Sequence, residues 1–126
     1  MIFYKINKMK TLVLGASSNP DRYSYLAVNR LIDHGHEVVP MGIKKGSVRG
    51  IQIKNSKVDL KDIDTVTLYL SPKNQLEYYD YLLKINPRRV IFNPGTINPE
   101  LMKKLENGGI EVVDACTLVM LSANTF

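Results

Sequence analysis

The stretch VLGASSNP, residues 13–20, has the residue types and the position of a phosphate-binding loop. It follows a short apolar run and precedes a segment with helical spacing, where nucleotide-binding α/β folds place such a loop. The dinucleotide fingerprint G-x-G-x-x-G needs three glycines, but only Gly15 is present, with Ser17 and Pro20 at the other two places. A helix start attracts anions through its free N–H groups even without those glycines. The loop therefore predicts an anion site, with the Ser17 and Ser18 hydroxyls and Arg22 as candidate phosphate ligands.

The segment MGIKK, residues 41–45, follows the second predicted strand and narrows the choice of nucleotide. Folds that bind NAD usually carry an acidic residue here, which holds the ribose 2′-hydroxyl. This chain has Lys44 and Lys45 instead, together with Met41 and Gly42. Two ammonium groups suit an additional ribose phosphate. NADP carries one at the 2′ position and CoA carries one at the 3′ position, so NAD is disfavoured.

Two further segments follow predicted strands. Leu70, Ser71 and Pro72 come after the third core strand, where Ser71-Pro72 is typical of a helix start and the segment could form an apolar wall for a ligand. Pro94 and Gly95 come after the fourth strand and indicate a turn that leaves the backbone open to a close ligand.

The elements that must position these residues alternate between strand and helix. Apolar strands are predicted over 10–16, 37–42, 64–71, 88–93 and 110–115, and a short strand over 51–54. Helices are predicted over 23–35, 72–85 and 99–109, the second with Leu76, Tyr79 and Leu83 on its core face. This order predicts a three-layer, Rossmann-like α/β fold of about five parallel strands with helices on both faces. Ligands of such sheets bind beyond the carboxyl ends of the strands.

Length and composition indicate one globular domain. The chain has 126 residues, which suits a lead-in segment over 1–9 and a single domain over 10–126. The net charge of +5 favours an anionic partner, but the lysines are spread without the aromatic pattern of nucleic-acid binders. One cysteine and no membrane-length apolar run indicate a cytoplasmic protein without disulfides.

No catalytic or metal-binding constellation stands out. His34 and His36 flank a helix end that faces away from the expected ligand side, and they are interpreted as surface residues. Cys116 has only Asp114 as a titratable neighbour, which would raise a thiol pKa, so a packing role is favoured over a mixed disulfide with a ligand thiol. The sequence therefore leans against an enzyme and predicts no metal.

The chain resembles the small stand-alone CoA-binding proteins of bacteria, which are similar to the nucleotide-binding domain of the succinyl-CoA synthetase alpha subunit. The stretches VLGASSNPDRYSYLAVNRLIDHGHEVVPMG, YLSPKNQ, NPGTINPELMKKLENGGIEVV and DAC carry the resemblance over roughly residues 10–117. It implies a phosphate loop formed by Gly15, Ala16, Ser17, Ser18, Arg22 and Tyr23, an adenosine-side segment with Met41 and Lys44, and contacts from Leu70, Ser71 and Pro72. The chain departs from the family pattern at Gly42 and Ile43, where Asn-Pro is common, and at Ala115, where arginine is common.

Three functions remain open at this point. The first is a module that binds CoA or an acyl-CoA for sensing, carriage or regulation. The second is an NADP-binding, oxidoreductase-like protein, which the two lysines would also suit. The third is a ligand-free interaction protein, with an apolar tail over 117–126 that packs on its own domain or on a second subunit.

Overall fold

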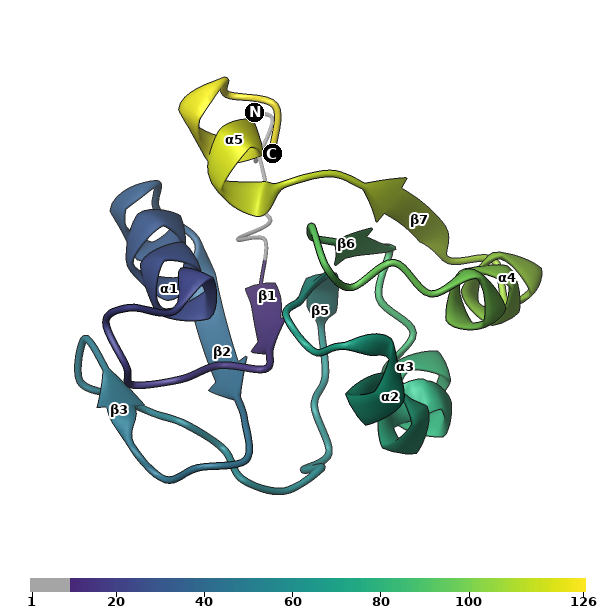
Figure 1. Ribbon diagram of the computed structural model, residues 1–126, viewed down its shortest axis with the longest axis horizontal. Helices are drawn as coiled ribbons and strands as arrows, with labels where there is room; N and C mark the ends of the chain where they lie inside the picture. The colour runs from purple at the N-terminus through teal and green to yellow at the C-terminus, as the bar shows by residue number, and fades with distance from the viewer. Residues whose placement is uncertain (1–9) are drawn as a thin grey trace, which may run out of the picture.

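Five short apolar segments form the central parallel sheet, as their alternation with helical segments predicts. The computed structural model describes residues 10–126, so the predicted lead-in over 1–9 lies outside the described residues. The strands, in spatial order, are β2 (Glu37–Met41), β1 (Lys10–Leu14), β5 (Ile63–Leu68), β6 (Arg89–Phe92) and β7 (Glu111–Asp114) (Figure 1). All neighbouring pairs are parallel. The predicted α/β fold class, with five parallel strands, is confirmed.

Helices cover both faces of this sheet (Figure 1). They are α1 (Tyr23–Asp33), α2 (Pro72–Gln75), the 3-10 turn η1 (Leu76–Tyr78), α3 (Tyr79–Ile85), α4 (Pro99–Asn107) and α5 (Thr117–Ser122). The α1 and α5 side buries Val28, Leu31 and Leu121, so the apolar tail packs on its own domain. The other side buries α3 and α4 residues such as Leu82 and Leu105. The described residues thus form the predicted three layers.

The segment after β5 differs from the single helix that the sequence predicts. Leu76 is 64% exposed and Leu83 is exposed, whereas Tyr81 and Leu82 are buried. The 3-10 turn η1 separates α2 from α3, and its tighter winding rotates the side chains that follow. The predicted core face with Leu76 and Leu83 is therefore wrong, because the spacing of a continuous α-helix does not apply across this turn.

A small hairpin follows β2 and returns the chain to the sheet edge. It pairs β3 (Ser47–Val48) with β4 (Ile51–Gln52), so the predicted strand over 51–54 is shorter than expected. An Arg49–Asp33 ion pair of 2.9 Å ties the hairpin to α1. Lys54 then forms an isolated parallel bridge with Met41. The ion pair and the bridge together hold the loop between β2 and the hairpin against the rest of the domain.

The strand order creates a crevice at one end of the sheet. From β1 the chain moves outward to β2, and it then crosses back to β5 on the other side of β1. Within this sheet the order is that of the doubly wound folds whose connections diverge at the switch point between the first and third strands. The loops after β1 and β5 therefore leave in opposite directions, and ligands of such folds bind between them.

Candidate functional site

A cavity of about 550 Å³ lies at the carboxyl ends of the strands, beside the switch point. The predicted site residues that line it are Gly15, Ala16, Ser17, Ser18, Arg22, Tyr23, Lys44, Lys45, Leu70, Ser71, Pro94 and Gly95. It is also lined by Asn19, Ser24, Ile43, Tyr69 and Thr96. The fold thus brings together loops that lie up to 81 positions apart, between Gly15 and Thr96.

The first loop turns sharply at Gly15 and is anchored to the end of β2. The backbone N–H groups of Gly15 and Ala16 both donate to the Met41 carbonyl at 2.9 Å. Gly15 has a φ of +97°, and a Cβ there would lie 3.0 Å from the Tyr69 carbonyl carbon. Glycine is required for both reasons. These two N–H groups shape the loop, so an anion must use donors further along the chain.

The turn that follows is stabilised by its own polar side chains. The Ser17 hydroxyl accepts from the Asn19 N–H at 3.0 Å, and the Asn19 side-chain oxygen accepts from the Asp21 N–H at 3.0 Å. The Arg22 N–H donates to the Asn19 carbonyl at 3.1 Å. These bonds fix the path of the chain into α1, and they explain why Asn19 lines the cavity although the sequence did not single it out.

Helix α1 begins at the cavity without a side-chain cap. Arg22 occupies the N-cap position but makes no capping bond, and the first turn contains no acidic residue. Within residues 10–126, the N–H groups of Tyr23 and Ser24 find no hydrogen-bond acceptor. An uncapped helix start combines free N–H donors with the positive end of the helix dipole. This end of the cavity is therefore suited to an anion.

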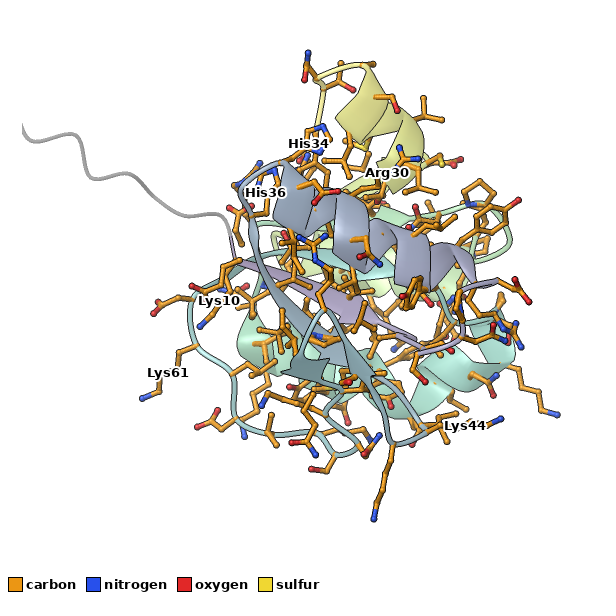
Figure 2. The ribbon with its side chains drawn as sticks, turned by 90° about the vertical axis from the view of Figure 1, so that its left-hand side faces the viewer. Lys10, Arg30, His34, His36, Lys44 and Lys61 are labelled. Carbon is orange, nitrogen blue, oxygen red and sulfur yellow. The ribbon has the colours of Figure 1, made fainter. Side chains whose placement is uncertain are left out.

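Cationic side chains surround the same end. Arg22, Lys44 and Lys45 all line the cavity, and no carboxylate lines it. In the described part of the chain, none of the three takes part in an ion pair. Lys10 is the first residue of β1, at the end of the sheet away from the cavity, and Figure 2 shows Lys44 far from it. The cavity thus has a cationic end whose charges have no protein counter-ion among these residues.

The other end of the cavity carries no charge. Leu70, which is 9% exposed, follows β5, and Pro94 and Thr96 follow β6, so all three lie on the side of β1 away from β2 and its lysines. Tyr69 also belongs to this lining, and burial raises the pKa of its hydroxyl to about 12, so it stays neutral near pH 7. The cavity therefore combines a cationic half, suited to phosphates, with a neutral and partly apolar half.

Three predicted site residues do not line the cavity, and each supports it from outside. Met41 is 1% exposed and contributes its carbonyl to the first loop. Gly42 is buried against that loop, and a Cβ there would lie 2.2 Å from the Ala16 carbonyl oxygen. Pro72 forms the first turn of α2. Ser24, Ile43, Tyr69 and Thr96 were missed although each neighbours a predicted residue, because spacing alone does not indicate which way a side chain points.

The remaining candidates for chemistry lie elsewhere. Cys116 occupies the N-cap position of α5, is half-buried and does not line the cavity. His34 and His36 lie near the far end of α1, away from Lys44 (Figure 2). Residues 10–126 contain no group of three side chains able to hold a metal ion. In the same range, no helix has the length and apolar character needed to cross a membrane.

Comparison with known proteins places this architecture in a family. A family model described as a CoA binding domain matches residues 9–122. No match was found among curated proteins.

Solved structures share the fold over nearly the whole chain. A crystal structure of an uncharacterised protein is 56% identical, with a TM-score of 0.92, covering 94% of this chain and 98% of that one. A hypothetical protein from Pyrococcus horikoshii OT3 is 31% identical, with a TM-score of 0.81 and coverage of 92% and 82%. A dinucleotide-forming acetyl-coenzyme A synthetase from Ca. Korarchaeum cryptofilum is 16% identical, with a TM-score of 0.72 and coverage of 85% and 25%, a likeness that shows the fold alone.

Proposed function

The chain belongs to the family of CoA-binding domains, and from this premise we propose that its cavity binds CoA or an acyl-CoA as a module without catalysis of its own. The observation that carries the proposal is the division of the cavity into a cationic and a neutral half. CoA has the same division, because its phosphates lie at the nucleotide end and its pantetheine arm is uncharged.

In this proposal each part of CoA is assigned to one part of the cavity. The uncapped start of α1 and the Arg22 guanidinium suit the diphosphate, as anions favour a helix N-terminus and charged donors. Lys44 and Lys45 suit the 3′-phosphate. Leu70, beside Pro94 and Thr96, suits the pantetheine arm, which needs apolar contact and few donors.

We further propose that the protein acts in the cytoplasm, in a sensing, carrier or regulatory role, and the composition of the cavity supports a role in binding. Its titratable side chains are Arg22, Lys44, Lys45 and two tyrosines. It therefore offers no carboxylate or histidine as a general base and no cysteine as a nucleophile. This composition supports binding rather than catalysis as the function, with a small nucleotide ligand as the first partner.

NADP is the second candidate ligand, because Lys44 and Lys45 would also suit a ribose 2′-phosphate. Against it, the family model that matches the chain is described as a CoA binding domain. The first loop also lacks two of the three glycines of the dinucleotide fingerprint. Both observations favour CoA over NADP.

A thermal-shift titration with CoA, 3′-dephospho-CoA, acetyl-CoA, NADP and NAD tests the proposal. At a ligand concentration a hundredfold above its dissociation constant, binding stabilises the folded state by about 2.7 kcal/mol. For a domain of this size, that corresponds to a midpoint shift on the order of 10 °C. We expect CoA and acetyl-CoA to give such shifts, 3′-dephospho-CoA a smaller one and NAD none.

Two outcomes of this titration would contradict the proposal. A shift with NADP and none with CoA would favour the oxidoreductase-like alternative. No shift with any of the five compounds would favour the ligand-free interaction protein.

A further inference from the structure

Two side-chain carboxamides lie outside the cavity lining and hold its two halves separately. From this arrangement we infer that Gln75 and Asn55 are positioning residues, Gln75 for the pantetheine half of the ligand and Asn55 for its phosphate half. The inference rests on the proposed binding of CoA. Neither residue lines the cavity, so each acts through the backbone that it holds.

Gln75 joins the two loops that form the neutral half. Its Nε2 donates to the Leu70 carbonyl at 2.8 Å and to the Thr96 carbonyl at 2.8 Å. Leu70 follows β5 and Thr96 follows β6, and both line the cavity. Its Oε1 accepts from the Asn98 side chain at 2.9 Å, which fixes the orientation of the amide. This side chain thereby joins the two walls of the neutral half directly, beyond the bond from Asn93 to the Leu68 carbonyl at the end of β5.

Burial makes Gln75 hard to replace. The residue is fully buried, with 0% exposure. Without the Gln75 amide, the buried Leu70 and Thr96 carbonyls would each lose a hydrogen-bond donor. Water could replace that donor only if the structure opened. We therefore expect the two loops to move relative to each other when Gln75 is substituted.

The loop that bears Thr96 has a second attachment, which confines the effect to the neutral half. The Thr96 hydroxyl donates to the Asn93 carbonyl at 2.7 Å, and the Asn93 side chain donates to the Thr67 hydroxyl at 2.7 Å and accepts from the Thr117 N–H at 2.8 Å. These bonds fix the loop to the sheet and to α5. No bond in this group reaches Arg22, Lys44 or Lys45.

Asn55 holds the loop of the cationic half by two hydrogen bonds of the same kind. Its Nδ2 donates to the Gly42 carbonyl at 2.9 Å and to the Lys44 carbonyl at 2.9 Å. Asn55 follows the β3–β4 hairpin in the chain, and its two bonds connect this later segment to the loop that presents Lys44 and Lys45. Because Asn55 is an exposed residue, water can partly replace its bonds, and we expect a smaller effect than for Gln75.

The test compares CoA with adenosine 3′,5′-bisphosphate, which keeps the ribose 3′-phosphate and one 5′-phosphate but lacks the pantetheine arm. Dissociation constants of both compounds are measured calorimetrically for wild type, Gln75→Met and Asn55→Ala. We expect Gln75→Met to weaken CoA about tenfold and the bisphosphate by less than about twofold. We expect Asn55→Ala to weaken both compounds by the same factor, about threefold. The matched controls are Asn74→Ala, next to Gln75 in the sequence, and Gln52→Ala, three positions before Asn55. Both change exposed carboxamides and should leave both constants unchanged.

For Gln75→Met, a general loss of structure would weaken both compounds equally, so the ratio of the two constants separates positioning from stability. For Asn55→Ala, the separating ratio is that of CoA to 3′-dephospho-CoA, because Asn55 holds the loop that presents Lys44 and Lys45. The preference for CoA should fall about threefold, and an unchanged preference overturns the Asn55 part of the inference. An unchanged ratio in Gln75→Met overturns the inference while the proposed function stands. If wild type binds neither compound, the proposed function fails and the inference fails with it. If Gln75→Met does not fold, Asn98→Asp replaces it, because this variant keeps the oxygen that caps α4 but removes the donor to Gln75. Its ratio should shift in the same direction, and an unshifted ratio overturns the inference.

Discussion

Gly42→Ala is expected to abolish detectable CoA binding and to lower the free energy of unfolding by about 1–3 kcal/mol or more, the usual cost of forcing an extra methyl into a packed site. The new Cβ would lie 2.2 Å from the Ala16 carbonyl oxygen, which is backbone and cannot rotate away. The loop at Ala16 must therefore move off β2, and Gly15 and Ala16 lose their bonds to the Met41 carbonyl. The measurement is a denaturant unfolding curve together with a CoA titration.

Gly108→Ala is the matched control for this substitution. Both glycines have ordinary backbone angles, so alanine introduces a contact without forcing a left-handed φ. The added Cβ at Gly108 would meet the end of the Leu83 side chain at 3.0 Å, which can adjust. CoA binding should be retained in Gly108→Ala. Wild-type affinity in Gly42→Ala would contradict the view that the contact between Gly42 and Ala16 sets the shape of the first loop.

Replacing both Lys44 and Lys45 by alanine is expected to lower CoA affinity by about ten- to a hundredfold. Each exposed lysine should contribute about 1 kcal/mol to a phosphate contact, and each ~1.4 kcal/mol is tenfold in affinity. Affinity for 3′-dephospho-CoA should hardly change, because that compound lacks the phosphate assigned to these lysines. The wild-type preference for CoA over 3′-dephospho-CoA should disappear in the double variant. Both constants are measured at low and moderate salt, and the salt dependence should also fall.

Lys103 and Lys104 provide a control pair of equal charge. They are exposed on α4 and do not line the cavity. Replacing both by alanine changes the net charge by the same amount and should leave the preference intact. If the α4 pair reduced the preference as much as Lys44 and Lys45 do, the lysines would act through overall charge rather than at a 3′-phosphate site.

The sequence predicts the sheet and most of the cavity lining because both depend on local patterns. Short apolar runs separated by helical spacing give parallel strands buried on both faces. In such a sheet, the residues after each strand meet at one end whatever the details of the helices. Ser17, Lys44, Leu70 and Gly95 therefore lie around one cavity although they are distant in the sequence.

Other features depend on contacts that no local pattern encodes. Gln75 lies in the short helix α2, whose sequence PKNQ is polar and does not single it out. Its role depends on its bonds to the Leu70 and Thr96 carbonyls, which only the folded chain brings near it. Asn55 lies in a lysine-containing loop and is informative only once the hairpin returns it to Gly42. The 3-10 turn after α2 changes the phase of the helix, so the exposure of Leu76 could not be predicted from helical spacing.

The most direct test of the central claim is amide chemical-shift mapping of isotope-labelled protein during titration with CoA. If the cationic half holds the phosphates, the N–H groups of Tyr23 and Ser24 at the start of α1 should show the largest changes, together with those of Lys44 and Lys45. Smaller changes should appear at Leu70 and Thr96, beside the pantetheine arm. Changes confined to the opposite end of the sheet, around His36 and Arg89, or no change at millimolar CoA, would contradict the claim that this cavity is a CoA site.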